Sequence, residues 1–252
     1  MSGGSYLVFA TCVALATFVQ NLTGFAFSLI LLGLVGVLRL ASIHDAANAA
    51  TVLTLVNAAV YFRQRGLQPG WRVMKPAIPA SWLGVGLGVA ALHWLSAHAV
   101  EGLRMLLGLA ILVCAILLLR RGPPLPQVSR PRSFALIGGL SGLLGGLFSS
   151  AGPPLVYLMY RQPLARELVQ QCLILMFALN ALLRLALVLA GGDFSREALL
   201  LSACAVPVVY AVNTLQHRHP LRLDLRKTQL LVGALLLLTG ALLLGNGLAA
   251  LK

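Results

Sequence analysis

The stretch SFALIGGLSGLLGGLFSSAGPPLVYLMY, residues 133–160, contains the feature that decides the fold of this chain. It is apolar along its length, as membrane helices are, but two adjacent prolines interrupt it at Pro153 and Pro154. Proline lacks an N–H donor and disfavours helix in the preceding residue, so residues 149–152 are expected to leave the helix. Because proline suits the first turn of a helix, a new half-helix is expected to start at Pro153 or Pro154. The stretch predicts a broken membrane segment.

The composition places the rest of the chain in the membrane as well. Of its 252 residues, 59% are hydrophobic and 10% are charged, whereas a soluble domain is about one quarter charged. These values exclude an ordinary cytosolic enzyme and a disordered chain. A spanning helix needs about 20 apolar residues, so we predict an all-α, polytopic membrane protein with roughly eight segments. The apolar segments cover residues 5–40, 46–62, 73–95, 102–119, 133–160, 168–190, 198–216 and 229–249.

The chain divides at the polar, proline-rich stretch of residues 120–132 into two similar halves, residues 1–122 and 130–252. Each half opens with a broken run, at residues 20–25 (QNLTGF) and at residues 149–154 (SSAGPP). Each continues with a helix that carries a central asparagine, Asn57 or Asn180, and then with a helix containing an internal proline, Pro79 or Pro207. Each closes on a leucine-rich helix. This order predicts an internal repeat.

The distribution of Lys and Arg decides between two topologies. If every segment simply crosses the membrane, the cations divide almost evenly between the two sides. If segments 5–40 and 133–160 each enter and return to the same side, fourteen cations lie on one side and only Arg39, Arg104, Arg196 and Lys252 on the other. The second arrangement satisfies the positive-inside rule, so we prefer it. It makes the two halves inverted repeats, each with a broken, re-entrant first segment and three transmembrane helices, and it places both termini in the periplasm.

The charge and the motifs narrow the functional class. The net charge of +13 arises from cations in short loops, which the positive-inside rule explains without nucleic acid. The four cysteines lie singly in apolar runs, so neither a disulfide framework nor a metal site is indicated. No apolar segment carries a central Asp or Glu, and no acid–base cluster occurs. We therefore expect no enzyme, no cofactor and no proton relay through a buried carboxylate.

The two breaks are the candidate substrate site. A half-helix that begins at membrane depth presents free N–H groups and the positive end of its dipole, which suit an anion. Asn21 or Thr23 is a candidate N-cap in the first half. The alternative is that the small residues only allow close helix packing. The candidate substrate-binding residues are Gln20, Asn21, Thr23, Gly24, Asn57, Ser149, Ser150, Gly152, Pro153, Asn180 and Arg184.

Three of these residues lie outside the breaks, and two interpretations of the role of each remain open. Asn57 and Asn180 either line a path or form hydrogen bonds between helices. Arg184 is the one cation well inside an apolar run. Its guanidinium either binds an oxyanion or extends outward to the membrane surface.

With two four-segment halves that each open on a glycine-rich broken segment, the chain resembles the sulfite exporter TauE/SafE family. The second break is the closer match, with the pattern G-x-x-G-G-x-x-S-x-A-G-P-P between residues 138 and 154. The first break has Asn21-Leu22-Thr23 where the family commonly has glycines. The resemblance implies a transporter that exports a sulfite-like oxyanion or an organosulfonate across the bacterial inner membrane. The expected partners are that anion, the lipid bilayer and, as an open question, a second copy of the chain. The alternative function is a non-transporting membrane subunit or assembly factor.

Overall fold

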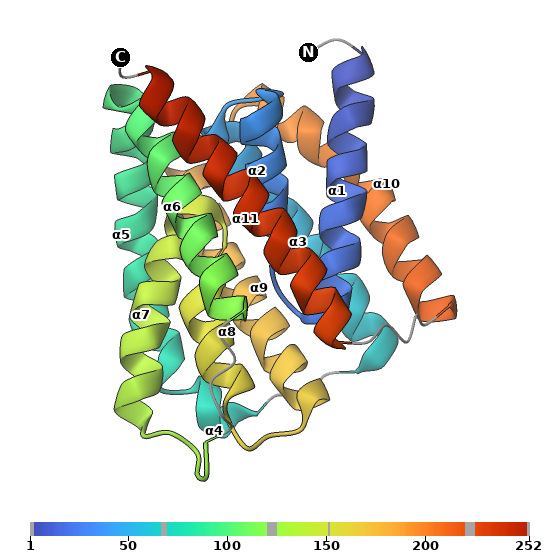
Figure 1. The fold of residues 1–252 in the computed structure, drawn as a ribbon, viewed down its shortest axis with the longest axis vertical. Helices are drawn as coiled ribbons and strands as arrows, with labels where there is room; N and C mark the ends of the chain where they lie inside the picture. The colour runs from blue at the N-terminus through green and yellow to red at the C-terminus, as the bar shows by residue number, and fades with distance from the viewer. Residues whose placement is uncertain (1–2, 67–69, 120–124, 151, 220–224, 251–252) are drawn as a thin grey trace.

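The computed structural model describes residues 3–66, 70–119, 125–150, 152–219 and 225–250. Within these ranges the chain forms eleven helices and no strand, which confirms the predicted all-α fold (Figure 1). The helices are α1 (Gly3–Thr23), α2 (Phe27–Leu38), α3 (Ile43–Arg65), α4 (Trp71–Met74), α5 (Ala77–His98), α6 (Val100–Leu119), α7 (Pro131–Phe148), α8 (Pro153–Tyr160), α9 (Arg166–Ala190), α10 (Arg196–Arg218) and α11 (Leu225–Ala250).

Both segments that were predicted to be broken are broken in the structure. The first becomes α1 and α2, and the second becomes α7 and α8, with α8 beginning at Pro153 as expected. The 12 residues of α2 and the 8 residues of α8 span about 18 Å and about 12 Å, too short for a bilayer core of about 30 Å. Among the described helices, α1, α5, α6, α9 and α10 are long and apolar enough to cross a membrane.

The two ends of the bundle differ in which connections they hold. At the upper end in Figure 1, α1 begins and α11 ends. The same end holds the α2–α3, α5–α6 and α9–α10 connections. At the lower end, α3 meets α4, α8 meets α9, and α7 begins. α1 thus begins at the same end of the bundle at which α11 ends.

The lower end is the basic one. Among the described side chains, nine cations belong to helix ends and connections there, and three to those of the upper end. The nine are Arg63, Arg65, Arg72, Lys75, Arg130, Arg132, Arg161, Arg166 and Arg218, and the three are Arg39, Arg104 and Arg196.

The glycines of α7 form a close helix contact with α5. A Cβ atom added at Gly142 would collide with the backbone oxygen of Ser81, and one added at Gly146 would collide with that of Val85. Small residues allow two membrane helices to approach to backbone contact, so this glycine-rich run serves helix packing. The contact also positions the last turn of α7 beside α9.

One proline was assigned wrongly from the sequence. Pro79 lies in the first turn of α5, because α5 begins only at Ala77 after the separate short helix α4. A proline there breaks no hydrogen bond, since the first helical N–H groups have no partner within the helix. Pro207 lies inside α10 as predicted.

Candidate functional site

The first break is a tight left-handed turn between α1 and α2. Gly24 and Ala26 both have positive φ angles, +78° and +77°. Glycine adopts this conformation readily, whereas the same conformation costs about 1–2 kcal/mol of free energy in an L-residue such as alanine. The predicted caps are therefore wrong: Asn21 and Thr23 still belong to α1, and the N-cap of α2 is Ala26, which makes no side-chain hydrogen bond.

The second break also contains a residue with a positive φ angle where the first helix of the pair ends. α7 ends at Phe148, Ser149 has a positive φ of +53°, and Gly152 is the N-cap of α8. The two breaks are in direct contact, because the hydroxyl of Ser28 in α2 donates a 2.7 Å hydrogen bond to the backbone oxygen of Ser149.

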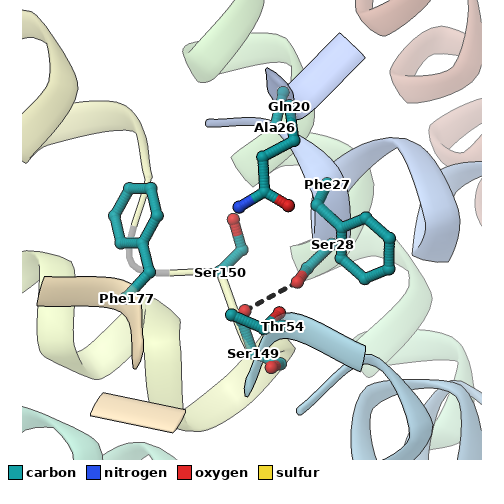
Figure 2. Close-up of a pocket in the computed structure, with 8 residues that line it drawn as sticks. All are labelled: Gln20, Ala26, Phe27, Ser28, Thr54, Ser149, Ser150 and Phe177. Carbon is teal, nitrogen blue, oxygen red and sulfur yellow. Dashed lines mark hydrogen bonds between the residues drawn. The ribbon is translucent and has the colours of Figure 1, made fainter. Parts of the chain in front are cut away.

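A small cavity lies where the two breaks meet (Figure 2). Its lining residues are Gln20, Ala26, Phe27, Ser28, Thr54, Ser149, Ser150 and Phe177. Figure 2 shows the amide of Gln20 directed towards Ser150, with the rings of Phe27 and Phe177 on opposite sides. The cavity has room for about one water molecule.

The start of α2 supplies hydrogen-bond donors to this cavity. The first intrahelical bond of α2 comes from the N–H of Ile30, which donates to the oxygen of Ala26. The N–H groups of Phe27, Ser28 and Leu29 precede it and have no partner within the helix. They also form the positive end of the α2 dipole, so this wall of the cavity favours negative charge. The start of α8 offers fewer donors, since its first two residues are both prolines.

A second donor on the cavity wall is the hydroxyl of Thr54. Its side chain is buried, and its Oγ1 atom has no hydrogen-bond partner. A buried hydroxyl without a partner costs about 1–3 kcal/mol, so Thr54 adds an unfilled hydrogen-bonding capacity to a cavity that the first turn of α2 also lines. Nothing in the sequence signals this role, because threonine is common in membrane helices.

Gln20, which lines the cavity, also belongs to a chain of buried amides that includes Asn57. Asn57 donates to Gln20 at 2.8 Å and accepts a 2.6 Å bond from Asn213 of α10. Asn21 donates to the side-chain oxygens of both Asn213 and Gln216. The structure thus places Asn57 and Asn21 in hydrogen bonds between helices and not on the cavity wall. Sequence reasoning missed Asn213 and Gln216, which lie near the end of α10.

Asn180 of α9 is likewise held by a neighbouring helix. Its side-chain oxygen lies 2.9 Å from the hydroxyl of Ser81 on α5, and its Nδ2 atom is buried without a partner. Thr23 also acts locally, because its hydroxyl bonds the oxygen of Val19 within α1.

Arg184 does not reach the membrane surface, so that reading of it is wrong. Its side chain is 1% exposed. Its Nε donates to the oxygen of Gly146 at 2.9 Å, and its Nη1 donates to Asn48 and Thr51 of α3. The close contact of α7 with α5 and the packing of α9 on α3 and α7 hold these acceptors around the guanidinium.

The structure therefore brings some of the candidate residues together and leaves others apart. Gln20, Ser149 and Ser150 line the cavity, and Gly24 lies in the left-handed turn that precedes α2. Among the described lining residues, those not anticipated are Ala26, Phe27, Ser28, Thr54 and Phe177. Gly152, the N-cap of α8, is not among the described lining residues, and Pro153 is the first residue of α8.

The chain is similar to known proteins over most of its length. A family model described as sulfite exporter TauE/SafE matches residues 9–244, which include both breaks and the whole cavity lining. The chain is also 32% identical, over 204 residues, to the probable sulfite/organosulfonate exporter TauE of Cupriavidus necator, a match that covers 81% of this chain and 80% of that protein. No solved structure matches the chain. The chain, a multi-pass helical membrane protein, belongs to the sulfite exporter TauE/SafE family.

Proposed function

We propose that this protein exports a small sulfur oxyanion or an organosulfonate across the bacterial inner membrane. The observation that carries the proposal is the cavity between the two breaks, whose lining includes the first turn of α2, with N–H groups that have no partner within the helix, and the unpartnered Thr54 hydroxyl. The described lining includes no carboxylate that would repel an anion. Family membership and the name of the Cupriavidus necator relative point to the same substrates.

The lining suits both parts of such a substrate. The oxygens of sulfite or of a sulfonate accept hydrogen bonds, and the N–H groups of α2 together with the hydroxyls of Thr54 and Ser150 can donate them. The rings of Phe27 and Phe177 offer an apolar surface to the sulfur or to a short alkyl group. This division favours a compact oxyanion with one apolar face.

The small volume implies that the protein must change shape to carry its substrate. Sulfite is larger than the single water molecule for which the cavity has room. Towards the start of α3, Arg184 joins this helix to α7 and α9, and towards its end the amide chain joins it to α1 and α10. Alternating access requires these two sets of contacts to open in turn.

We assign the basic lower end to the cytoplasm, following the positive-inside rule. Nine of the described cations at helix ends belong to it, against three at the upper end. Both termini then lie in the periplasm.

We further propose that residues 1–122 and 130–252 are inverted repeats. In this assignment α1 and α2 correspond to α7 and α8, α3 to α9, α5 to α10 and α6 to α11. The packing supports it, because α1 packs on α10 as α7 packs on α5, and α3 packs on α10 as α9 packs on α5. In Figure 1, α1 runs down from the upper end whereas α7 runs up from the lower end.

Flux through purified protein tests the function. Proteoliposomes loaded with sulfite or methanesulfonate should release it faster than protein-free liposomes. A non-transporting subunit or assembly factor would give no flux for either ion.

A further inference from the structure

Arg184 is a buried cation without an opposite charge beside it. Burying a charge is strongly unfavourable unless it is paired or well solvated by polar groups. Among the described residues, no carboxylate forms an ion pair with Arg184. Of the acids at this end of the bundle, Asp45 accepts hydrogen bonds from two serine hydroxyls, the carboxylate of Asp193 lies 3.0 Å from His93, and Glu101 forms an ion pair with Arg104.

The contacts of the guanidinium are all neutral. They are the backbone oxygens of Gly146 and Ala47 and the side-chain oxygens of Asn48 and Thr51. Gly146 lies in the last turn of α7, where the helix dipole carries about half of a negative charge, so it offsets only part of the positive charge. The Nη2 atom of Arg184 is buried and has no partner. A net positive charge therefore remains inside the protein.

This charge lies next to the cavity. Thr51, which contacts Arg184, has its hydroxyl oxygen 3.0 Å from that of Ser149, and Ser149 lines the cavity. Two hydroxyl groups thus separate the guanidinium from the space between the breaks. Arg184 itself is not among the described lining residues, so it acts on the cavity through its field and through these hydroxyls.

We propose that Arg184 is the fixed countercharge of the transported anion and sets the preference of the site for ligand charge. This inference rests on the proposed function. Arg184 is a positioning residue that holds Thr51 and Ser149, and its field stabilises negative charge in the cavity without contact. The site consequently discriminates by net charge as well as by shape.

Ligands of similar shape but different charge test this role. Dimethyl sulfone is neutral, methanesulfonate carries one negative charge, and sulfite at alkaline pH carries two. In Arg184→Gln, the Kd should be unchanged for dimethyl sulfone, raised about tenfold for methanesulfonate and raised about a hundredfold for sulfite, because the electrostatic energy scales with ligand charge. Arg184→Lys should recover most of the loss. Arg196→Gln removes an exposed cation at the same end of the bundle and should change none of the three.

The contrary outcomes are distinct. If the role of Arg184 were purely structural, Arg184→Gln would raise the Kd of all three ligands by the same factor, and that result would overturn the inference.

The substitution Thr51→Val keeps the charge of Arg184 but removes the hydroxyl, so it should raise the Kd of both anions by the same factor. If Arg184→Gln does not fold, the native protein still decides, since equal binding of dimethyl sulfone and methanesulfonate would contradict a countercharge.

Failure of this inference is separable from failure of the proposed function. Native protein that moves neither sulfite nor methanesulfonate would contradict transport. Native protein that moves both, with no charge-graded loss in Arg184→Gln, would contradict only the role of Arg184.

Discussion

Ser28 and Ser149, 121 positions apart in the chain, join the two broken membrane segments through a single 2.7 Å hydrogen bond. The donor is the hydroxyl of Ser28 in the first turn of α2, and the acceptor is the backbone oxygen that α7 leaves free where it ends. Because a free backbone carbonyl within a membrane must be satisfied by the protein, this bond helps make the break tolerable. It also holds the start of α2 against the second break, beside the cavity.

The substitution Thr54→Val should change stability and binding in opposite directions. Removing the unpartnered hydroxyl should leave the substrate-free protein as stable as native or more stable by about 1 kcal/mol. Losing a hydrogen bond to a charged substrate should raise the Kd for sulfite about tenfold. Thermal unfolding with and without sulfite measures both quantities.

A matched control is Thr214→Val, whose hydroxyl bonds only within α10 at an exposed position. It should leave the Kd for sulfite unchanged. A Thr54→Val protein that binds sulfite as tightly as native would show that the hydroxyl does not contact the substrate.

The close contact of α5 with α7 should not tolerate a single added methyl group. In Gly142→Ala the new Cβ meets the backbone oxygen of Ser81, which cannot move without separating the helices. We expect a loss of about 2 kcal/mol or more in unfolding free energy. Gly86→Ala in α5 adds the same group in open space and should be neutral or slightly stabilising. Unfolding in detergent compares the two, and equal stabilities would refute the packing argument.

The topology predicts where reporters become active. A reporter that functions only in the cytoplasm should stay silent when it is fused after Lys252, because the C-terminal end of α11 is at the less basic end. The same reporter fused after Gln127, between α6 and α7, should be active. An active C-terminal fusion would reverse the assigned orientation.

Export should follow the membrane potential. An anion that leaves a cell with a negative interior gains about 2.3 kcal/mol per charge per 100 mV. The described cavity lining has no carboxylate that could carry a proton, so we expect no obligatory proton coupling through a side chain. In liposomes with equal pH on both sides, potassium and valinomycin set the potential, and methanesulfonate flux should follow it. Flux that ignores the potential but follows a pH gradient would contradict uniport.

Much of the fold could be predicted because its signals are local. The prolines at residues 153 and 154 remove two N–H donors, and α8 begins at the first of them. Five of the eight predicted apolar runs are single helices in the structure, namely α3, α6, α9, α10 and α11. The other three are helix pairs, α1 with α2, α4 with α5 and α7 with α8. The runs could be recognised because hydropathy and length decide which segments enter a membrane. Pro79 was misplaced because the whole apolar run was taken as one helix, although Pro76, the N-cap of α5, marks the start of a new helix just before it.

The amino-acid sequence by itself determined the all-α class, the two breaks and the basic end of the bundle, since each follows from the chemistry of neighbouring residues. Only the tertiary structure decided which polar residues face the cavity. Thr54 and Asn57 lie within one turn of each other on α3, yet Thr54 lines the cavity and Asn57 bonds Gln20 and Asn213. Likewise, Arg184 is buried because Gly146, Asn48 and Thr51, from two other helices, surround it. The direction and partners of a buried side chain depend on helices distant in sequence, and no local pattern records how those helices pack.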